Sequence, residues 1–349
     1  MPTAERLAAV ADAFARRPEL GFNGAAALRA FIAGELGDAE ILDRPVTVGG
    51  VTLRARAPEM IYHLCAANLS VSAETSLLIG LMLGSRLVFK LPAAGLPEFC
   101  ATVSALPPAL RAAVTLLSRH DPALMLAADA VVAYGTDETV AAIHRQTHWR
   151  QRFLGYGHKI SLGLIERGDE TPAFAAAAAR EVLAYEQLGC LSPQAYLCRD
   201  PERGEQFAAL LASALAGQRR TRPMPGLDFD RAALRQHFRQ AAAARGEKIL
   251  AGADGEYLVI SGARQLAAGP AHAAVSVLSA WEIPDPELWR DKLSAVSHSS
   301  PLTPAAIAYF TDLGVSRFCP TGGLQHPPLA WRHDTRPRLA DLVRWVTFN

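Results

Sequence analysis

The chain has 349 residues, half of them hydrophobic and a fifth charged, which is typical of a globular protein and excludes a disordered one. A net charge of +1 without a long basic run gives no indication of a nucleic-acid partner, and we take the basic cluster of Arg219, Arg220 and Arg222 as a solvated loop. This length predicts about two domains with sizeable cores.

The first part of the chain alternates predicted helices with predicted strands. Residues 1–40 are rich in alanine, which predicts helices, and residues 46–56 alternate like a strand or hairpin. Further strands are predicted at 60–66, 86–91, 130–134 and 159–165, and helices at 73–83 (with Ser72 as N-cap), 96–106, 108–118, 137–146 and 172–187. This alternation predicts a mostly parallel sheet covered on both faces.

The alternation resumes after Gly189. We predict strands at 195–198 and 257–261, a loop at 218–229, and helices at 202–215, 231–244, 303–313 and 339–345, with Pro304 suited to a first helical turn. The most apolar stretch, residues 77–89, is too short to span a bilayer. Residues 1–17 contain no signal-peptide core.

The cysteines are few and widely spaced. The chain has Cys65, Cys100, Cys190, Cys198 and Cys319. No CxxC pair or Cys/His cluster with zinc spacing occurs, so neither a disulfide framework nor a metal site is predicted. A reducing, cytoplasmic environment fits this usage of cysteine.

One of these cysteines stands in the segment Gly-Cys-Leu-Ser-Pro, residues 189–193. We predict that Ser192 caps a helical turn beginning at Pro193, whose positive end would favour the thiolate of Cys190. Gly189 would allow a substrate to approach closely. Taken alone, the pattern is more typical of a buried structural cysteine.

Two polar residues follow predicted strands. Asn68 could donate its side-chain amide to a developing oxyanion, although a plain turn residue is the more ordinary interpretation. Lys90 is one of only four lysines among 35 basic residues. A lysine at the carboxyl end of a parallel strand lies where open α/β sheets bind ligands, and it is as often a solvated strand end.

Two glycine-containing turns follow later strands. Gly135 and Thr136 stand between a predicted strand and a helix, an arrangement that can hold a phosphate through backbone N–H groups, as well as being ordinary capping. Gly155 and Gly157 lack the third glycine of a dinucleotide fingerprint, and no GxGxxG occurs in the chain. No GxSxG elbow occurs either, so a serine hydrolase is not indicated.

The order and approximate spacing of these residues resembles the aldehyde dehydrogenase superfamily. There, the residues matching Asn68, Lys90 and Gly135 are an oxyanion asparagine, a lysine on the adenosine ribose and a glycine at the pyrophosphate. The turn at residues 157–159 resembles a Gly-Gly-Lys turn, and Cys190 matches the nucleophilic cysteine. The cofactor domain of that superfamily is a Rossmann variant without GxGxxG.

A closer resemblance is to the fatty acyl-CoA reductases of the bacterial luminescence type, over roughly residues 58–349. Residues 185–194 are similar to their cysteine motif, residues 132–138 to their phosphate turn, and residues 314–320, 331–334 and 342–345 to their C-terminal segment. The chain departs from them at residues 67–70, Ala-Asn-Leu-Ser, where they have Gly-Asn-X-Pro. Oxidising relatives place a glutamate base where this chain has Gly155, which favours a reductase.

The resemblance implies an α/β, aldehyde dehydrogenase-like fold. A Rossmann-variant cofactor domain would cover residues 1–188, with residues 319–349 returning to it, and an α/β catalytic domain would cover residues 189–318. The implied reaction is the reduction of an acyl thioester to an aldehyde by NADPH or NADH through a thioacyl-Cys190 intermediate. Asn68 would hold the oxyanion, and the cofactor would be bound by Lys90, Gly135, Thr136, Gly157 and Lys159.

Two other functions stay open. One is an NAD(P)-dependent aldehyde dehydrogenase, and the other a cofactor-free cysteine acyltransferase or thioesterase. The expected partners are an acyl-CoA or carrier-bound substrate, an acyl-activating or carrier protein, and further copies of the chain. We expect no metal, no nucleic acid and no membrane span, and a cytoplasmic location.

Overall fold

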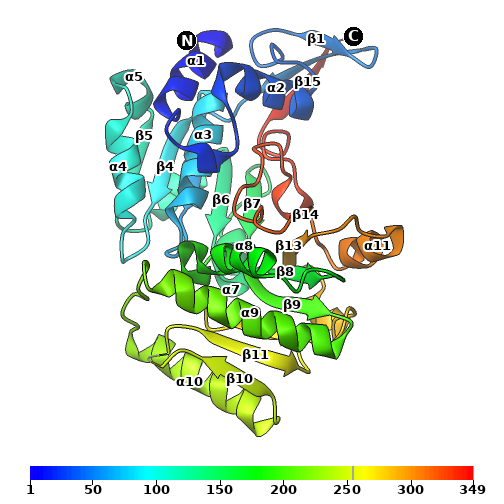
Figure 1. Ribbon diagram of the computed structural model, residues 1–349. Helices are drawn as coiled ribbons and strands as arrows, with labels where there is room; N and C mark the ends of the chain where they lie inside the picture. Colours follow the sequence, from blue (N-terminus) through cyan, green and yellow to red (C-terminus); the bar gives the residue numbers. More distant parts are fainter. Residues whose placement is uncertain (254, 349) are drawn as a thin grey trace. The chain divides into compact units, whose positions relative to one another are not determined.

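A computed structural model describes residues 1–253 and 255–348 and divides into two compact units. Unit 1 comprises Met1–His158 with the C-terminal segment from His326, and unit 2 comprises Lys159–Gln325 (Figure 1). The sequence placed the division after residue 188. It falls earlier because the strand that follows Lys159 pairs with strands of the second unit's sheet.

Unit 1 is built on a parallel five-stranded sheet in the order β5-β4-β3-β6-β7. Its strands are β3 (Met60–Leu64), β4 (Arg86–Lys90), β5 (Val114–Leu117), β6 (Ala130–Tyr134) and β7 (Arg152–Tyr156). All of β3 is buried, and the strands are runs of apolar residues, as expected of a sheet covered on both faces.

The helices of unit 1 cover both faces of this sheet. They are α1 (Thr3–Ala13), α2 (Gly24–Leu36), α3 (Ser70–Leu83), α4 (Pro97–Ala105), α5 (Pro108–Arg111), α6 (Pro122–Ala127) and α7 (Asp137–His144), with a 3₁₀ turn, η1 (Pro18–Leu20). The first four helices share one core with the sheet, and α6 and α7 contribute to another on its opposite face. The predicted N-cap at Ser72 is wrong, because Ser72 lies inside α3 and its hydroxyl donates to the Leu69 carbonyl at 3.0 Å.

Two other predictions for unit 1 are wrong. Residues 108–118 do not form one helix, because α5 ends at Arg111 and β5 then pairs with β4. Residues 339–345 do not form a final helix, since residues 344–348 form a strand, β15 (Arg344–Phe348). This strand pairs antiparallel with β2 (Val51–Arg56), which also forms the predicted hairpin with β1 (Val46–Val48).

Unit 2 contains a seven-stranded sheet in the order β10-β11-β12-β9-β8-β13-β14. The strands are β8 (Ile160–Ile165), β9 (Pro193–Cys198), β10 (Lys248–Ala251), β11 (Leu258–Ala263), β12 (Ala274–Leu278), β13 (Leu293–His298) and β14 (Arg317–Pro320). Every pairing is parallel except that of β10 with β11. Strands β7, β10, β12, β13 and β14 were not predicted from the sequence.

Helices cover both faces of this second sheet as well. They are α8 (Pro172–Leu183), α9 (Pro201–Arg219), α10 (Phe229–Ala244) and α11 (Pro304–Asp312), with 3₁₀ turns η2 (Ala184–Gln187) and η3 (Pro286–Trp289). Residues of α8 and α9 share one core with the sheet, and residues of α10 and α11 share another. Thr303 caps α11 and Pro304 lies in its first turn, as the sequence predicted.

Within residues 1–253 and 255–348, no helix combines the length and the apolar character that crossing a membrane requires.

Candidate active site

The predicted site residues of unit 1, catalytic and cofactor-binding, lie along one edge of its sheet, which we call the carboxyl edge. Asn68 follows β3, Lys90 ends β4, Gly135 and Thr136 follow β6, and Gly157 follows β7. These four strands are parallel neighbours, so their carboxyl ends meet at the same side of the sheet. Open α/β sheets bind ligands at this side.

Lys90 is a cation on the carboxyl edge. Its backbone carbonyl accepts the Cys65 N–H at 3.1 Å. No carboxylate of the described chain forms an ion pair with its ammonium group, which is half-buried. Burial raises the pKa of the neighbouring Cys65 thiol to about 12, so this thiol stays neutral beside Lys90. The lysine is therefore free to meet an anionic ligand.

The turns after β6 and β7 are joined to each other. Asp137, in the first turn of α7, accepts the His158 N–H at 2.9 Å. A Cβ atom at Gly157 would collide with the Asp137 carboxylate, so a larger residue there would push this carboxylate away from the His158 N–H. Thr136 caps α7 by accepting the Thr139 N–H at 3.3 Å. This edge of the sheet is thus held by side-chain contacts on both turns.

A stack of aromatic rings underlies these turns. Tyr134 stacks on Tyr156 with 4.8 Å between ring centroids, and Tyr156 stacks on His333 at 4.7 Å. Trp331 packs on His333, also at 4.7 Å. His333 belongs to a 3₁₀ turn, η4 (His333–Thr335). The C-terminal motif at residues 331–334 therefore supports the ends of β6 and β7.

Gly155 has no room for a side chain. It lies inside β7, and a Cβ atom there would collide with Val140 Cγ1 and approach the Phe153 ring to 2.8 Å. This is the position that the resemblance aligns with the glutamate base of oxidising relatives. Gly155 itself offers no proton acceptor, and the packing of α7 on β7 crowds this position.

Cys190 lies in unit 2, half-buried between η2 and β9. The prediction of a helical turn beginning at Pro193 is wrong, because Pro193 opens β9, a fully buried strand between β8 and β12. The helix dipole therefore gives no account of a thiolate here. Ser192 does not cap a helix, and its hydroxyl instead accepts a hydrogen bond from Gln325 Nε2 at 3.2 Å.

The backbone that leads to Cys190 adopts an uncommon conformation. Tyr185, Glu186 and Gln187 all have left-handed φ angles, of 51°, 52° and 62°. Such residues persist where the surrounding structure holds them, and they concentrate at functional sites. Further on, the Ser161 hydroxyl donates to the Cys190 carbonyl at 2.7 Å.

The first restraint on this turn is an ion pair. Both carboxylate oxygens of Glu186 accept from the Arg219 guanidinium, at 2.9 and 2.7 Å. Burial opposes ionisation of Glu186, but the His272 ring, 3.7 Å away, and the hydrogen-bonded Arg219 guanidinium outweigh it and lower the pKa of Glu186 to about 2. Arg219 is 1% exposed, so our assignment of it to a solvated basic cluster is wrong.

The second restraint is the buried amide of Gln187. Its Nε2 donates to the carbonyls of Pro193 and Ala274 at 2.8 and 2.9 Å, and its Oε1 accepts the Ala274 N–H at 3.0 Å. These bonds fasten the turn to the beginnings of β9 and β12. The sequence analysis did not identify Ser161, Gln187 and Arg219 as supports of this turn. Of the three, only Gln187 could have been found, because it lies within the cysteine motif at residues 185–194.

A third set of contacts joins α8 and the turn to the loop at residues 322–325. The buried carboxylate of Glu181, on α8, accepts the N–H groups of Gly322 and Leu324 at 2.6 and 2.9 Å. Burial raises the pKa of Glu181 to about 7, although these donors oppose the shift. Gln325, at the end of the same loop, reaches Ser192, and Leu191 packs against Leu324.

The structure thus brings five of the predicted site residues together on the carboxyl edge of unit 1: Asn68, Lys90, Gly135, Thr136 and Gly157. Cys190 and Lys159 belong to unit 2. Lys159 is the first residue of unit 2 and directly precedes β8.

Solved structures with a similar fold are aldehyde dehydrogenases. The indole-3-acetaldehyde dehydrogenase AldA of P. syringae matches with a TM-score of 0.68 at 13% identity, over 100% of this chain and 85% of that one. The NADP-dependent glyceraldehyde-3-phosphate dehydrogenase of Bacillus halodurans matches with a TM-score of 0.68 at 14% identity, over 100% and 87%. The chain therefore has the aldehyde dehydrogenase fold, as the sequence predicted.

The family model described as Acyl-CoA reductase (LuxC) matches residues 22–345, and the chain belongs to this family. A long-chain acyl-protein thioester reductase of Aliivibrio fischeri is 26% identical over 172 residues, which are 46% of this chain and 36% of that protein. A long-chain acyl-protein thioester reductase 2 of Photobacterium leiognathi is 26% identical over 184 residues, 48% of this chain and 38% of that protein. The matched segments thus span little more than a third of these curated relatives.

Proposed function

We propose that this protein reduces an acyl thioester to an aldehyde through a thioacyl-Cys190 intermediate, with NADPH or NADH. The observation that carries the proposal is the setting of Cys190 in a chain of the acyl-CoA reductase family. The cysteine is half-buried, and the buried groups of Gln187 and Arg219 hold the left-handed turn that leads to it. A purely structural cysteine has no need of such a turn.

Cys190 acts as the nucleophile in this proposal. Its thiolate attacks the thioester carbonyl carbon, the C–S bond to the donor breaks, and the CoA or carrier thiolate leaves. The acyl group then remains on Cys190 Sγ. The Asn68 side-chain amide and the Cys190 N–H are the proposed donors to the oxyanion. Ser161 supports this role, because its bond to the Cys190 carbonyl fixes the orientation of the adjoining backbone.

The carboxyl edge of unit 1 fits a nicotinamide dinucleotide. The unpaired Lys90 ammonium supplies a positive charge for an anionic group, and the turn at Gly135 and Thr136 lies at the N-terminus of α7. Gly157 and Lys159 complete the proposed set. When bound, a reduced nicotinamide supplies the hydride, which no side chain of the protein can provide. We propose NADPH as the preferred form.

The direction of the reaction follows from Gly155. An oxidising enzyme needs a base to activate the water that hydrolyses its thioacyl intermediate. Gly155 provides none, and its neighbours leave no room for one. This favours thioester reduction over an NAD(P)-dependent aldehyde dehydrogenase. The arrangement of Lys90 and Gly135 on one ligand-binding edge argues against a cofactor-free acyltransferase or thioesterase.

The test is to follow the absorbance of reduced nicotinamide with a panel of acyl-CoA thioesters and to trap the aldehyde. Cys190→Ser should abolish aldehyde formation and leave the fold intact, because a serine hydroxyl is a far weaker nucleophile than a cysteine thiolate. Cys100→Ser is the matched control at another partly exposed cysteine and should retain activity. Full activity in Cys190→Ser would refute the mechanism.

The acyl donor, the cellular location and the oligomeric state are also proposals. The names of the two curated relatives specify an acyl-protein thioester, so an acyl carrier or acyl-enzyme partner belongs in the substrate panel beside acyl-CoA. A cytoplasmic location accords with five free thiols. Light scattering of the purified chain would test the expected homo-oligomer.

A further inference from the structure

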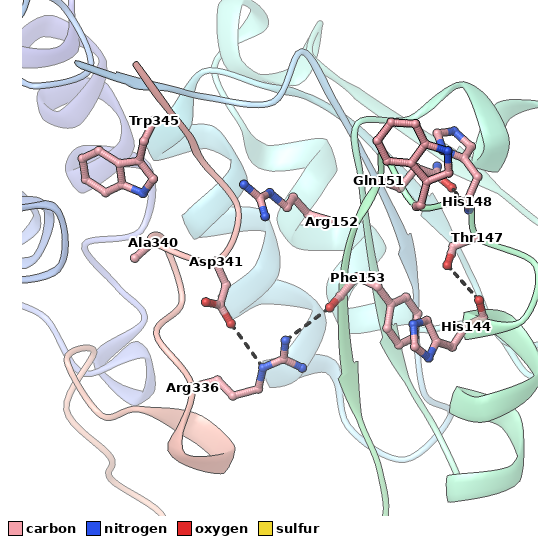
Figure 2. Close-up of a pocket in the computed structure, with 11 residues that line it drawn as sticks. His144, Thr147, His148, Gln151, Arg152, Phe153, Arg336, Ala340, Asp341 and Trp345 are labelled. Carbon is pink, nitrogen blue, oxygen red and sulfur yellow. Dashed lines mark hydrogen bonds and ion pairs between the residues drawn. The ribbon is translucent and has the colours of Figure 1, made fainter. Parts of the chain in front are cut away.

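A cavity, which we call the β7 cavity, lies in unit 1 at the amino end of β7, opposite the carboxyl edge. Its volume is about 630 Å³, within the range of small-molecule sites. It is lined by the segment 144–153 on one side and by residues 336–345 of the C-terminal segment on the other (Figure 2). None of its lining residues has a part in the proposed reaction.

The loop on one side of the cavity is held in place by a buried amide. Gln151 Nε2 donates to the carbonyls of Met125 and Ala128 at 2.6 and 2.8 Å, and its Oε1 accepts the His148 N–H at 3.1 Å. The Thr147 hydroxyl donates to the carbonyl that ends α7, at 2.7 Å. The cavity is therefore formed before any ligand arrives, which lowers the entropic cost of binding.

The charges of the cavity leave one cation unpaired. Arg336 is engaged by Asp341 at 3.2 Å and by the Phe153 carbonyl at 3.3 Å. This ion pair also neutralises the single carboxylate of the lining. Arg152 is exposed, and its guanidinium makes no ion pair or hydrogen bond within the described chain; Figure 2 shows it extending into the space between β7 and the C-terminal segment. It is the group that an anion would meet.

Two exposed indoles accompany this cation. Trp149 is 86% exposed and Trp345 is 40% exposed, and both line the cavity. The Arg150 guanidinium lies 4.8 Å from the Trp149 ring centroid and orders one side of that indole. Exposed tryptophan beside an unpaired arginine is suited to a planar ring that carries an anionic group. The charged and polar lining does not suit a fatty acyl chain.

We propose that the β7 cavity binds a phosphorylated nucleotide, with its base against Trp149 and a phosphate on Arg152. Arg152 offers parallel N–H donors that match phosphate oxygens. The same chemistry is presented by the nucleotide end of CoA and by free nucleotides such as ATP. The proposal does not depend on the proposed reaction, because it uses no residue of the carboxyl edge or of the Cys190 turn.

The test is calorimetric titration of the full chain with adenosine 3′,5′-bisphosphate and with ATP, with inorganic phosphate as a probe that lacks the base. Arg152→Gln and Trp149→Ala should each weaken nucleotide binding about tenfold or more, and Trp149→Ala should leave the weak binding of phosphate unchanged. Arg111→Gln is the matched control, an exposed arginine of α5 that leads into β5, at the other end of the sheet's strand order from β7, and should change nothing. Both test residues are exposed, so melting temperatures should stay unchanged.

The remaining outcomes decide which nucleotide binds and where on the protein it binds. Tighter binding of the bisphosphate assigns the nucleotide end of CoA, and tighter binding of ATP assigns a free nucleotide. Loss of binding in Lys90→Ala, with affinity kept in Arg152→Gln, would place the nucleotide on the carboxyl edge and overturn the proposal. Absence of saturable binding would also overturn the proposal and assign the surface to solvent. If the protein binds no nucleotide and Trp149→Ala converts an oligomer to a monomer, the surface instead binds a second copy of the chain.

Discussion

The amide of Gln187 should contribute more to the free energy of unfolding than any exposed ion pair of this protein. Gln187→Met keeps the side-chain volume and removes three hydrogen bonds, of 2.8, 2.9 and 3.0 Å, in a residue that is 2% exposed. At about 1 kcal/mol net for each bond, the loss is about 3 kcal/mol, and buried backbone groups left without partners add about 1 kcal/mol. For a unit of this size, about 4 kcal/mol lowers Tm by roughly 10 °C.

The measurement is thermal and urea unfolding of the wild-type protein and the variant. Gln218→Met is the control, because that half-exposed amide makes one hydrogen bond, to the Ala176 carbonyl at 3.2 Å, and should cost less than about 1 kcal/mol. The rate of Cys190 alkylation by iodoacetamide should also rise in Gln187→Met below its melting range, since the turn loses its attachment to β12.

Two results would contradict this reasoning. A Gln187→Met protein within about 1 kcal/mol of wild type would show that the amide bonds are not what holds the turn. A destabilised variant with an unchanged alkylation rate and unchanged kcat would show that Gln187 supports β9 and β12 but does not position Cys190.

The other predictions concern the carboxyl edge, the missing base and a buried imidazole. Asn68→Ala should lower kcat by roughly 10²–10³ with little change in thioester binding, and an unchanged kcat would make Asn68 a turn residue. Lys90→Ala should raise KM for the nicotinamide far more than KM for the acyl donor, whereas equal changes would assign it to the fold. Because Gly155 offers no base, oxidation of an aldehyde with NADP should require added CoA, and rapid CoA-independent release of free acid would instead support the dehydrogenase. Burial lowers the pKa of His63 from 6.5 to about 3, so the unfolded chain binds the extra proton first, and stability should fall as the pH drops below about 6.5, by up to about 1.4 kcal/mol per pH unit. His63→Phe, which keeps the ring stacked on Phe89, should flatten this slope in unfolding measured between pH 4 and 7, and an unchanged slope would assign the acid sensitivity to other groups.

The sequence by itself determined the fold class and the order of the site residues. Apolar runs alternating with helical segments indicate a parallel sheet, and in such a sheet residues that directly follow strands must share one edge. This is why Asn68, Lys90 and Gly135, each predicted to follow a strand, lie on the same edge. The family resemblance singled out Cys190 through the order of motifs and not through its own surroundings, which alone favoured a structural cysteine.

Tertiary structure decided what local pattern does not encode. The sequence predicted a helical turn from Pro193 and a helix at 339–345, but Pro193 opens β9 and residues 344–348 form β15. Distant strands pair with them, β8 with Pro193 and β2 with residues 344–348. The turn before Cys190 is held by Arg219 and Ala274, which follow it far along the chain. Local propensity reports only a residue's near neighbours, whereas ladder hydrogen bonds and buried ion pairs join residues that only the folded chain brings together.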